Sequence, residues 1–342
     1  MSADSMPSSG NTTPSSDVAT AGGQRAVIEA ALRAFEDATQ PTLAVVLETS
    51  GSTYVSAGAI ALFDRSGQTG WLSGGCLEPE IARRAALAAA EGTIAWMEVD
   101  TRDDEALFGG SAIGCRGRLR LALLPLDSLQ GWQTLARLWL DCRGAMQLDL
   151  SSAGAITCRI GDVEESWQLG AATPDWSAAP DYSGRWQVAI DAPATVVLFG
   201  AGPEAPVLLP LLRSMGWLTT AIESRPRWLD AARLADALYQ EAPVRIVESA
   251  QFGDPFAALV MHHNFELDLE ALLALSAKPP PFIGLLGPRR RREDLFRLLP
   301  EASRERLRPT LQSPVGIDLG GRGPEAIALS IAAQLQSKWH GH

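Results

Sequence analysis

The sequence contains little cysteine, and this scarcity excludes two kinds of small protein. The four cysteines are Cys76, Cys115, Cys142 and Cys158, and none of them forms a C-x-x-C pair. Neither a zinc knuckle nor a disulfide scaffold is therefore expected. Reduced thiols fit this pattern best, so we predict a cytoplasmic protein.

Long apolar runs and basic residues are also scarce. No run of about 18 apolar residues occurs, so we predict no membrane span. The N-terminus lacks the basic and apolar regions of a secretory signal. The 29 Lys and Arg residues are outnumbered by 40 Asp and Glu, which gives a formal net charge of -11. Since phosphate backbones attract basic surfaces, nucleic acid is not an expected partner.

The length of 342 residues predicts two domains. Residues 1–23 are rich in Ser, Thr and Gly and are expected to form a disordered tail. Residues 24–170 predict an α+β domain with a mixed sheet, and residues 171–193 a linker. In residues 194–342, strand and helix patterns alternate, including a strand at 244–247 and a helix at 228–238. This alternation predicts an α/β fold with a Rossmann-like, doubly wound parallel sheet.

A glycine motif opens the second predicted domain. The pattern G-x-G-x-x-A at residues 200–205 follows a predicted strand, and Glu223 ends the next one. That context is typical of a dinucleotide-binding turn. However, Pro203 and Pro206 have no N–H to offer a phosphate, and Glu204 places a carboxylate there. The sequence thus predicts the fold more firmly than it predicts NAD binding. The alternative interpretation is that the glycines only form a tight turn between strand and helix.

A second glycine motif, SGGCLE at residues 73–78, lies between a predicted strand and a helix. Gly74 and Gly75 allow a tight turn and the close approach of a ligand. Cys76 would lie at the helix N-terminus, where the helix dipole favours a thiolate. Glu78 is near enough in sequence to accept a proton or to cap the helix. The alternative is a small structural cysteine beside a turn.

Cys115 is a second thiol in a glycine-rich setting. It lies in the sequence GCRG at residues 114–117, beside the guanidinium of Arg116, which would favour a thiolate. Cys142 and Cys158 have no such neighbours, so we interpret them as structural. Cys76, Cys115 and Glu78 are therefore the residues expected to carry chemistry.

Together these motifs resemble the XdhC family, the accessory proteins of xanthine dehydrogenase and related molybdenum hydroxylases. The resemblance covers most of the chain after residue 24, and the order and spacing of the motifs agree. Its motifs are ETSGSTY at 48–54, SGGCLE at 73–78, GC at 114–115, FGAG at 199–202, FIGLLG at 282–287, RRR at 289–291 and PVGIDLG at 314–320. Where the family has G-A-G-H-V-G, this chain has G-A-G-P-E-A, which implies a changed nucleotide or pterin pose.

The resemblance implies a cofactor chaperone rather than an enzyme. Such proteins bind the molybdenum cofactor, let a cysteine desulfurase supply its sulfido ligand, and deliver it to an apo-hydroxylase. It implies that Cys76 and Cys115 are molybdenum ligands or sulfur relays, because soft metal–sulfur chemistry favours thiolates, and that Glu78 controls a proton. Cofactor contacts would come from Gly51, Ser52, Gly74, Gly75, Arg116, Gly200, Gly202, Glu223, His263, Arg289 and Arg290.

Several alternatives remain at this point. Arg289 and Arg290 at a helix start either bind an anion or form a solvated face. His263 is either a ligand contact at a sheet edge or an ordinary surface histidine. An NAD(P)-dependent oxidoreductase and a cofactor-free scaffold for a partner enzyme are the competing functions, and a homodimer is left open. The presence of Cys76, Cys115 and Glu78 argues against the scaffold, because a scaffold has no need of thiols in glycine turns. The scarcity of tyrosine argues against the oxidoreductase.

Overall fold

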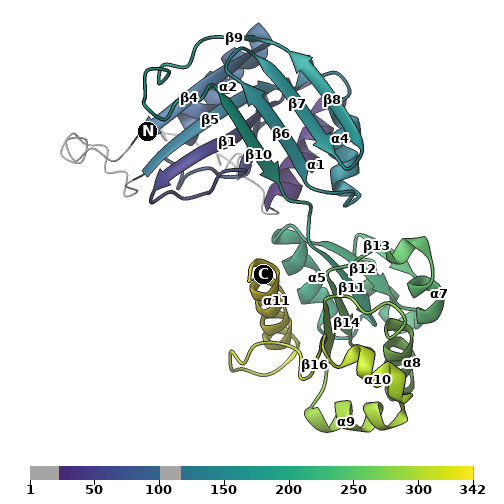
Figure 1. The fold of residues 1–342 in the computed structure, drawn as a ribbon. Coiled ribbons are helices and arrows are strands. Elements are labelled where there is room, and N and C mark those ends of the chain that lie inside the picture. Colours follow the sequence, from purple (N-terminus) through teal and green to yellow (C-terminus); the bar gives the residue numbers. More distant parts are fainter. Residues whose placement is uncertain (1–22, 101–116, 342) are drawn as a thin grey trace, which may run out of the picture.

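Three sheets organise the part of the chain that the computed structural model describes, residues 23–100 and 117–341 (Figure 1). Residues 1–22 of the tail expected over 1–23 lie outside these ranges, and so do the candidate residues Cys115 and Arg116. Gly23 is already the first residue of a helix. Within the described ranges, no helix is long and apolar enough to cross a membrane.

The first domain holds a six-stranded sheet in the order β3-β2-β1-β5-β4-β9 and a four-stranded sheet in the order β10-β6-β7-β8. Apart from the parallel pair β4–β9, the strand pairs of both sheets are antiparallel. Its elements are α1 (Gly23–Glu36), β1 (Thr42–Gly51), β2 (Ile60–Asp64), β3 (Gly67–Thr69), α2 (Glu78–Glu91), β4 (Thr93–Asp100), β5 (Gly117–Pro125), η1 (Leu126–Ser128), α4 (Trp132–Leu140), β6 (Met146–Ser151), β7 (Ala155–Ile160), β8 (Val163–Gln168), β9 (Gly170–Ala171) and β10 (Arg185–Ile190).

The side chains of strand β1 show how this domain is layered. Ala44 and Val46 pack with α2 on one face of the large sheet. Leu43 and Val45 pack on the other face with α1, α4 and the small sheet. Because both faces of β1 are covered, the strand reads as a continuous apolar run rather than an alternating one.

Strand β10 extends the first domain into the segment expected to be a linker. Within residues 171–193, β10 runs antiparallel to β6, with Trp186 opposite Leu150 and Ile190 opposite Met146. The connection to the second domain is therefore shorter than the composition of residues 171–184 suggested. Alternating buried and exposed residues along β10 explain the pairing, since only one face of the small sheet meets the core.

The second domain contains one parallel sheet in the order β13-β12-β11-β14-β15-β16, which confirms the predicted Rossmann-like architecture. Helices α5 and α11 cover one face and α7, α8, α9 and α10 the other. The elements are β11 (Thr195–Phe199), α5 (Ala205–Ser214), β12 (Leu218–Ile222), η2 (Pro226–Trp228), α6 (Leu229–Ala232), β13 (Ala237–Tyr239), α7 (Pro243–Val247), η3 (Ala250–Phe252), β14 (Ala257–Val260), α8 (Phe265–Leu275), β15 (Phe282–Leu285), α9 (Arg289–Leu298), α10 (Glu301–Leu307), β16 (Leu311–Gln312) and α11 (Pro324–His340).

Two local predictions in this domain were wrong. The apolar run at 244–247 forms helix α7 instead of a strand, and Pro243 begins that helix. The helix expected at 228–238 is only the four-residue α6, after which β13 adds a strand to the sheet. A short apolar run does not distinguish a buried strand from one turn of helix, which accounts for the first error. In the second, Asp236 accepts from the N–H and the hydroxyl of Thr219 on β12 and the chain after it pairs with that strand, so tertiary contacts end the helix early.

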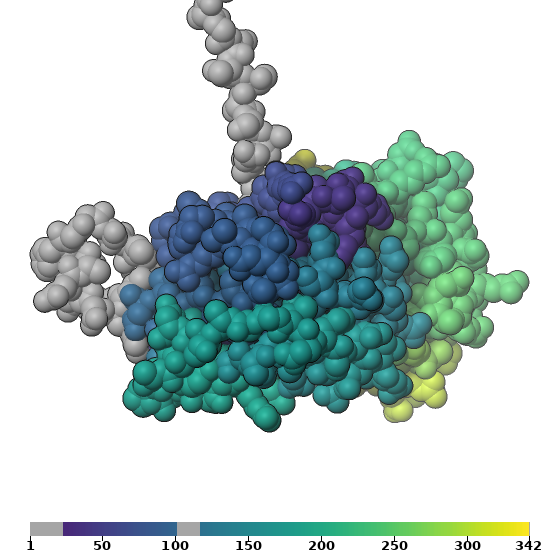
Figure 2. All heavy atoms as spheres, turned by 90° about the horizontal axis from the view of Figure 1, so that it is seen from above, coloured from purple at the N-terminus to yellow at the C-terminus, as the bar shows by residue number. Residues whose placement is uncertain are grey.

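Helix α1 joins the two domains through charged groups. Its Arg25 is 4% exposed and donates to the main-chain oxygen of Trp217 and to both carboxylate oxygens of Asp236 in the second domain. Arg213 of α5 also bonds Asp236 and reaches Glu29 of α1 at 3.1 Å. Figure 2 shows α1, in purple, lying against the green second domain. These ion pairs hold helices α1 and α5 at the contact between the two domains.

Candidate functional site

The loop between β3 and α2 presents a thiol to solvent. Cys76 is exposed and free, and it lies two residues before the first residue of α2. A Cβ atom at Gly74 would meet no other atom within 4 Å, and one at Gly75 would meet only the Trp71 ring, at 3.9 Å. Gly75 has a φ of +101°, which an L side chain rarely adopts. The predicted glycine turn therefore leaves open space beside Cys76.

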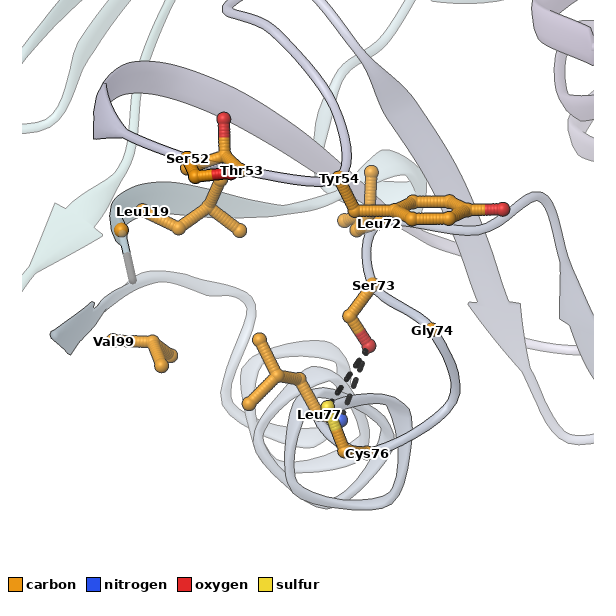
Figure 3. Close-up of a pocket in the computed structure, with 11 residues that line it drawn as sticks. Ser52, Thr53, Tyr54, Leu72, Ser73, Gly74, Cys76, Leu77, Val99 and Leu119 are labelled. Carbon is orange, nitrogen blue, oxygen red and sulfur yellow. Dashed lines mark hydrogen bonds between the residues drawn. The ribbon is translucent and has the colours of Figure 1, made fainter. Parts of the chain in front are cut away.

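Ser73 holds this loop together, and the sequence reasoning did not single it out. Its Oγ accepts hydrogen bonds from the N–H groups of Gly75 and Leu77, each at 3.2 Å. The Sγ of Cys76 lies 3.8 Å from the same oxygen (Figure 3). The N–H groups that it binds lie before α2 rather than in its first turn, so no helix-capping pattern in the sequence marks Ser73.

Glu78, the first residue of α2, is turned away from solvent and is only 4% exposed. Its carboxylate accepts from the N–H groups of Leu72 at 3.2 Å and Ser73 at 2.8 Å, and from the Ser73 hydroxyl. The expected link between Glu78 and Cys76 is thus indirect, because the Ser73 hydroxyl lies between the two groups. Burial of a carboxylate is tolerated here because these donors replace its water.

Cys76 lies at the mouth of a pocket between this loop and the edge of the large sheet (Figure 3). Ser52, Thr53 and Tyr54 form one wall, and Val99 and Leu119 form another. Ser52, predicted from sequence, therefore belongs to this site, whereas Gly51 ends β1 just before it. The cavity is small, about 40 Å³, which is room for a few water-sized groups.

Gly117 fixes how closely the pocket wall approaches the sheet. A Cβ atom there would lie 2.4 Å from the main-chain oxygen of Ser52 and 2.7 Å from the Thr53 side chain. Both distances are far shorter than van der Waals contact, so only glycine allows this approach. The candidate thiol of Cys115 is two positions away in sequence and lies outside the described residues.

A buried ion-pair cluster supports the strand that leads into the wall. Arg120 is fully buried and bonds Glu98 at 2.7 Å and Glu48 at 3.1 Å. Glu48 also accepts from the indole N–H of Trp186 and is followed by the wall segment in sequence. Burial lowers the pKa of Arg120, but the carboxylates of Glu98 and Glu48 raise it by more, so the net shift is upward. The guanidinium therefore stays charged.

The glycine turn of the second domain is filled by the protein itself. Gly200 has a φ of +96°, and a Cβ there would lie 2.6 Å from Cα of His262. A Cβ at Gly202 would lie 2.8 Å from the ring of His263. That ring, itself 46% exposed as a side chain, bonds the buried carboxylate of Glu204 at 2.9 Å. The His263–Glu204 pair therefore covers the position where the predicted phosphate would approach.

Glu223 is also engaged within the protein. Its carboxylate accepts from the N–H of Ala201 at 3.0 Å and from the Arg225 guanidinium at 2.6 and 2.9 Å. Burial raises the pKa of Glu223, but the hydrogen bonds from Arg225 and Ala201 lower it by more, so the net shift is downward. A ribose hydroxyl would need this carboxylate, which is already paired.

These contacts test whether the turn fits a nicotinamide dinucleotide, the cofactor typical of this fold. The N–H of Ala201 is taken, Pro203 and Pro206 have none, and the Glu204 carboxylate lies where the pyrophosphate charge would lie. The described residues do not fit that group. Arg225, which the sequence reasoning missed, is the side chain that closes the turn, since it also donates to the main-chain oxygen of His262 at 2.7 Å.

The arginines at the start of α9 have different surroundings. Arg291 bonds the buried carboxylate of Asp268 at 2.6 Å, and Asp268 in turn bonds His262 at 3.1 Å. Arg289 and Arg290 are exposed, and the side chain of Arg290 is 91% exposed. Both belong to the solvated face of α9 rather than to the filled turn. Within residues 23–100 and 117–341, no group of three or more His, Cys, Asp or Glu side chains could hold a metal ion.

Comparison with known proteins agrees with this division into two parts. Residues 35–100 match the model of the XdhC and CoxI family, and residues 196–335 match that of the XdhC Rossmann domain. The chain belongs to the XdhC family. It is 28% identical over 327 residues to a protein of Bacillus subtilis (strain 168) that is named as a probable xanthine dehydrogenase subunit, and the match covers 88% of this chain and 94% of that one.

The fold is similar to that of a solved protein. A crystal structure described as a xanthine dehydrogenase from Bacillus halodurans superposes with a TM-score of 0.76 at 25% sequence identity. The match covers 93% of this chain and 96% of the other. Both domains described above are therefore shared with that protein.

Proposed function

We propose that this chain is a maturation factor for a xanthine dehydrogenase-type molybdenum hydroxylase. In this proposal it binds the molybdenum cofactor as cargo, holds it while a cysteine desulfurase supplies the sulfido ligand, and delivers it to the apo-enzyme in the cytoplasm. The client class follows from the names of the relatives, and the chemistry follows from the first-domain loop.

The observation that carries the proposal is the exposed Cys76 thiol in its open glycine loop. Thiolate is a ligand that soft metal–sulfur centres prefer, and the loop keeps the sulfur accessible to an incoming group. The cavity beside it has room for a sulfur atom but not for a tricyclic pterin. We therefore place the molybdenum end of the cargo at Cys76 and the pterin outside the cavity.

Cofactor retention tests this proposal. The purified full chain is mixed anaerobically with free molybdenum cofactor, and molybdenum and oxidised pterin are measured after gel filtration. We expect near-stoichiometric retention by the wild type and loss of most of it in Cys76→Ala. Cys142→Ala is the matched control, since Cys142 is half-buried in the same domain, and it should retain the cargo. Cys115→Ala, measured alongside, decides whether that thiol is a second ligand.

Two results would contradict the proposal: a wild type that retains neither molybdenum nor pterin, or a Cys76→Ala variant that retains as much as the wild type. Delivery and sulfuration are tested next by activation of an apo-hydroxylase, with and without a cysteine desulfurase and cysteine. Activation should need both the desulfurase and the loaded chain. The order of addition then shows whether sulfur enters before transfer.

Simple binding measurements distinguish the two competing functions from the cofactor chaperone. An NAD(P)-dependent oxidoreductase would change the fluorescence of NADH or NADPH on binding, and the filled Gly200–Gly202 turn leads us to expect no change at millimolar nucleotide. A cofactor-free scaffold would bind the apo-hydroxylase equally well after Cys76→Ala and without cargo. Either result would replace the chaperone proposal.

A further inference from the structure

The exposed aromatic rings of this molecule gather at one loop. In residues 23–100 and 117–341, Tyr54 at 62% and Trp71 at 45% are the only aromatic side chains that are exposed. Exposed apolar residues scattered singly over a surface are ordinary. These two rings are not scattered, because Tyr54 lines the same pocket as Cys76 (Figure 3) and a Cβ on Gly75 would lie 3.9 Å from the Trp71 ring. Both rings therefore border the loop that carries the thiol.

Tight packing next to Trp71 turns its ring outward. A Cβ atom on Gly70 would lie 2.7 Å from the Val27 side chain of α1 and 3.1 Å from the main-chain oxygen of Ile60. Only glycine allows the chain to lie this close to α1 and β2. Leu72, on the other side of Trp71, is 1% exposed and packs in the core on the α2 face of the large sheet. The residue between these two anchored positions is left facing solvent.

Tyr54 is held in a similar way, and both rings have free faces. The Thr53 hydroxyl donates to the main-chain oxygen of Val55 at 2.7 Å, a hydrogen bond that spans Tyr54 and fixes the backbone that carries it. In the described part of the chain, neither Tyr54 nor Trp71 stacks on another ring or on a cation. Each ring can therefore stack on a planar ligand, and a backbone held beforehand lowers the entropic cost of that binding.

We propose that Trp71 and Tyr54 are the stacking contacts for the pterin ring of the cargo. The proposal rests on the maturation role given to this chain above, and it adds the residues that hold the organic part of the cofactor. With molybdenum at Cys76, the attached fused ring has to lie over the open glycine loop, because the cavity of about 40 Å³ does not admit it. Trp71 and Tyr54 border that loop, and indole and phenol rings bind flat heterocycles through their π-faces.

A protein partner would use the same two residue types, but the surface favours a small ring. Trp and Tyr are common hot spots of protein interfaces. Such an interface buries about 800 Å² on each partner around a central apolar cluster. At this loop the groups beside the two rings are Gly74, Gly75 and Cys76, all exposed, and they leave open space rather than an apolar face. A flat heterocycle fits that space better than a second protein surface does.

Binding of 6-carboxypterin, a fluorescent pterin without molybdenum, tests the proposal on the full chain. The wild type should quench its fluorescence saturably. We expect Trp71→Ala and Tyr54→Ala each to raise the Kd about tenfold, within the range for a base stacked on an aromatic side chain. Trp71→Phe and Tyr54→Phe keep a ring and should restore most of the affinity. Trp167→Ala removes a half-buried tryptophan of β8 in the same domain and should leave the Kd unchanged.

Molybdenum retention by the same variants lets the two proposals fail separately. Cys76→Ala should lose molybdenum and still bind 6-carboxypterin like the wild type. A wild type that retains molybdenum but does not bind the free pterin would overturn the stacking contacts and leave the maturation role standing. Alanine variants that bind the pterin as tightly as the wild type would do the same.

Two further outcomes separate the remaining cases. A wild type that binds the pterin through Trp71 and Tyr54 but retains no molybdenum would support the stacking contacts and contradict the maturation role. Alanine variants that bind the pterin normally but no longer bind an apo-hydroxylase would assign the two rings to a protein interface, and the proposal would be wrong.

Discussion

Two turns in this molecule have the same local design and opposite surroundings. Residues 73–78 and residues 200–205 each lead through glycines into the start of a helix. At the first, an added Cβ on Gly74 would meet nothing, and a thiol faces solvent. At the second, His263 and Glu204 occupy the space, and Glu223 takes the free N–H.

The difference shows that a glycine motif specifies a backbone path and not a ligand. In both turns buried carboxylates bind main-chain N–H groups, Glu78 in the first and Glu223 in the second. The two turns differ in whether a side chain from a distant part of the sequence covers the glycines. Among the described residues the first turn has none, and the second has the histidine after β14. The three predictions below separate the two turns, beginning with the largest effect.

The strongest contrast is expected in stability. Gly200→Ala adds a methyl group 2.6 Å from His262 Cα at a φ of +96°, so we expect the free energy of unfolding to fall by about 3 kcal/mol. Gly74→Ala, the matched change in the open turn, should alter it by less than about 0.5 kcal/mol. Urea unfolding of the two variants measures both values. Equal losses would mean that the first turn is as crowded as the second.

The next contrast is in thiol reactivity. Burial raises the pKa of Cys142 to about 11 and that of Cys158 to about 12, and the charge of Asp141 adds to the first of these. Near neutral pH both should therefore react with iodoacetamide at least a hundredfold more slowly than Cys76 in the open turn. Peptide mapping by mass spectrometry at timed intervals gives the three rates. If the three thiols reacted at comparable rates in the folded protein, the conclusion that only the Cys76 loop is open would be wrong.

The smallest contrast is a pH effect confined to the filled turn. The hydrogen bond to Glu204 raises the pKa of His263, and burial opposes it only in part. Because the folded pKa exceeds the unfolded one, this contribution is fully present below about pH 6.5 and is lost as the pH rises through the folded value. For a half-exposed ring we expect a few tenths of a kcal/mol.

His263→Gln should remove that part of the pH dependence, measured by urea unfolding at several values between pH 5.5 and 8.5. His340→Gln changes a histidine at the end of α11, away from the turn, and serves as the control. A pH dependence that survives His263→Gln, or that disappears in the control, would place the titrating group elsewhere.

The sequence predicted the layered fold well because long apolar patterns carry that information. The alternation after residue 194 and the buried run of β1 both appear in the structure as expected. The short run 244–247 failed because four apolar residues satisfy either a strand or a helical turn, and the proline before it was the better signal. Local ambiguity of this kind is settled by tertiary packing.

The candidate site was predictable only in part. Cys76 and Glu78 were predicted because their residue types and glycine neighbours are conspicuous in the sequence, and Ser52 came from the family resemblance alone; the structure brings the three to one loop and its pocket. Ser73 and Arg225 were missed because their importance comes from what they reach across a turn. The covering of Gly202 by His263 joins residues far apart in the chain, which no local pattern reveals.

Arg25 has a consequence for how the molecule comes apart. It belongs to a helix of the first domain, where it pairs with Glu29, yet it also pairs with Asp236 and donates to the Trp217 oxygen of the second domain. Separating the domains would expose Arg25 to water and break its bonds to Asp236, while Arg25 keeps Glu29 and Asp236 keeps Arg213, so the loss is about 1.5–3 kcal/mol. Heating should therefore melt both halves in a single calorimetric peak, so that damage to either glycine turn lowers the melting temperature of the whole chain.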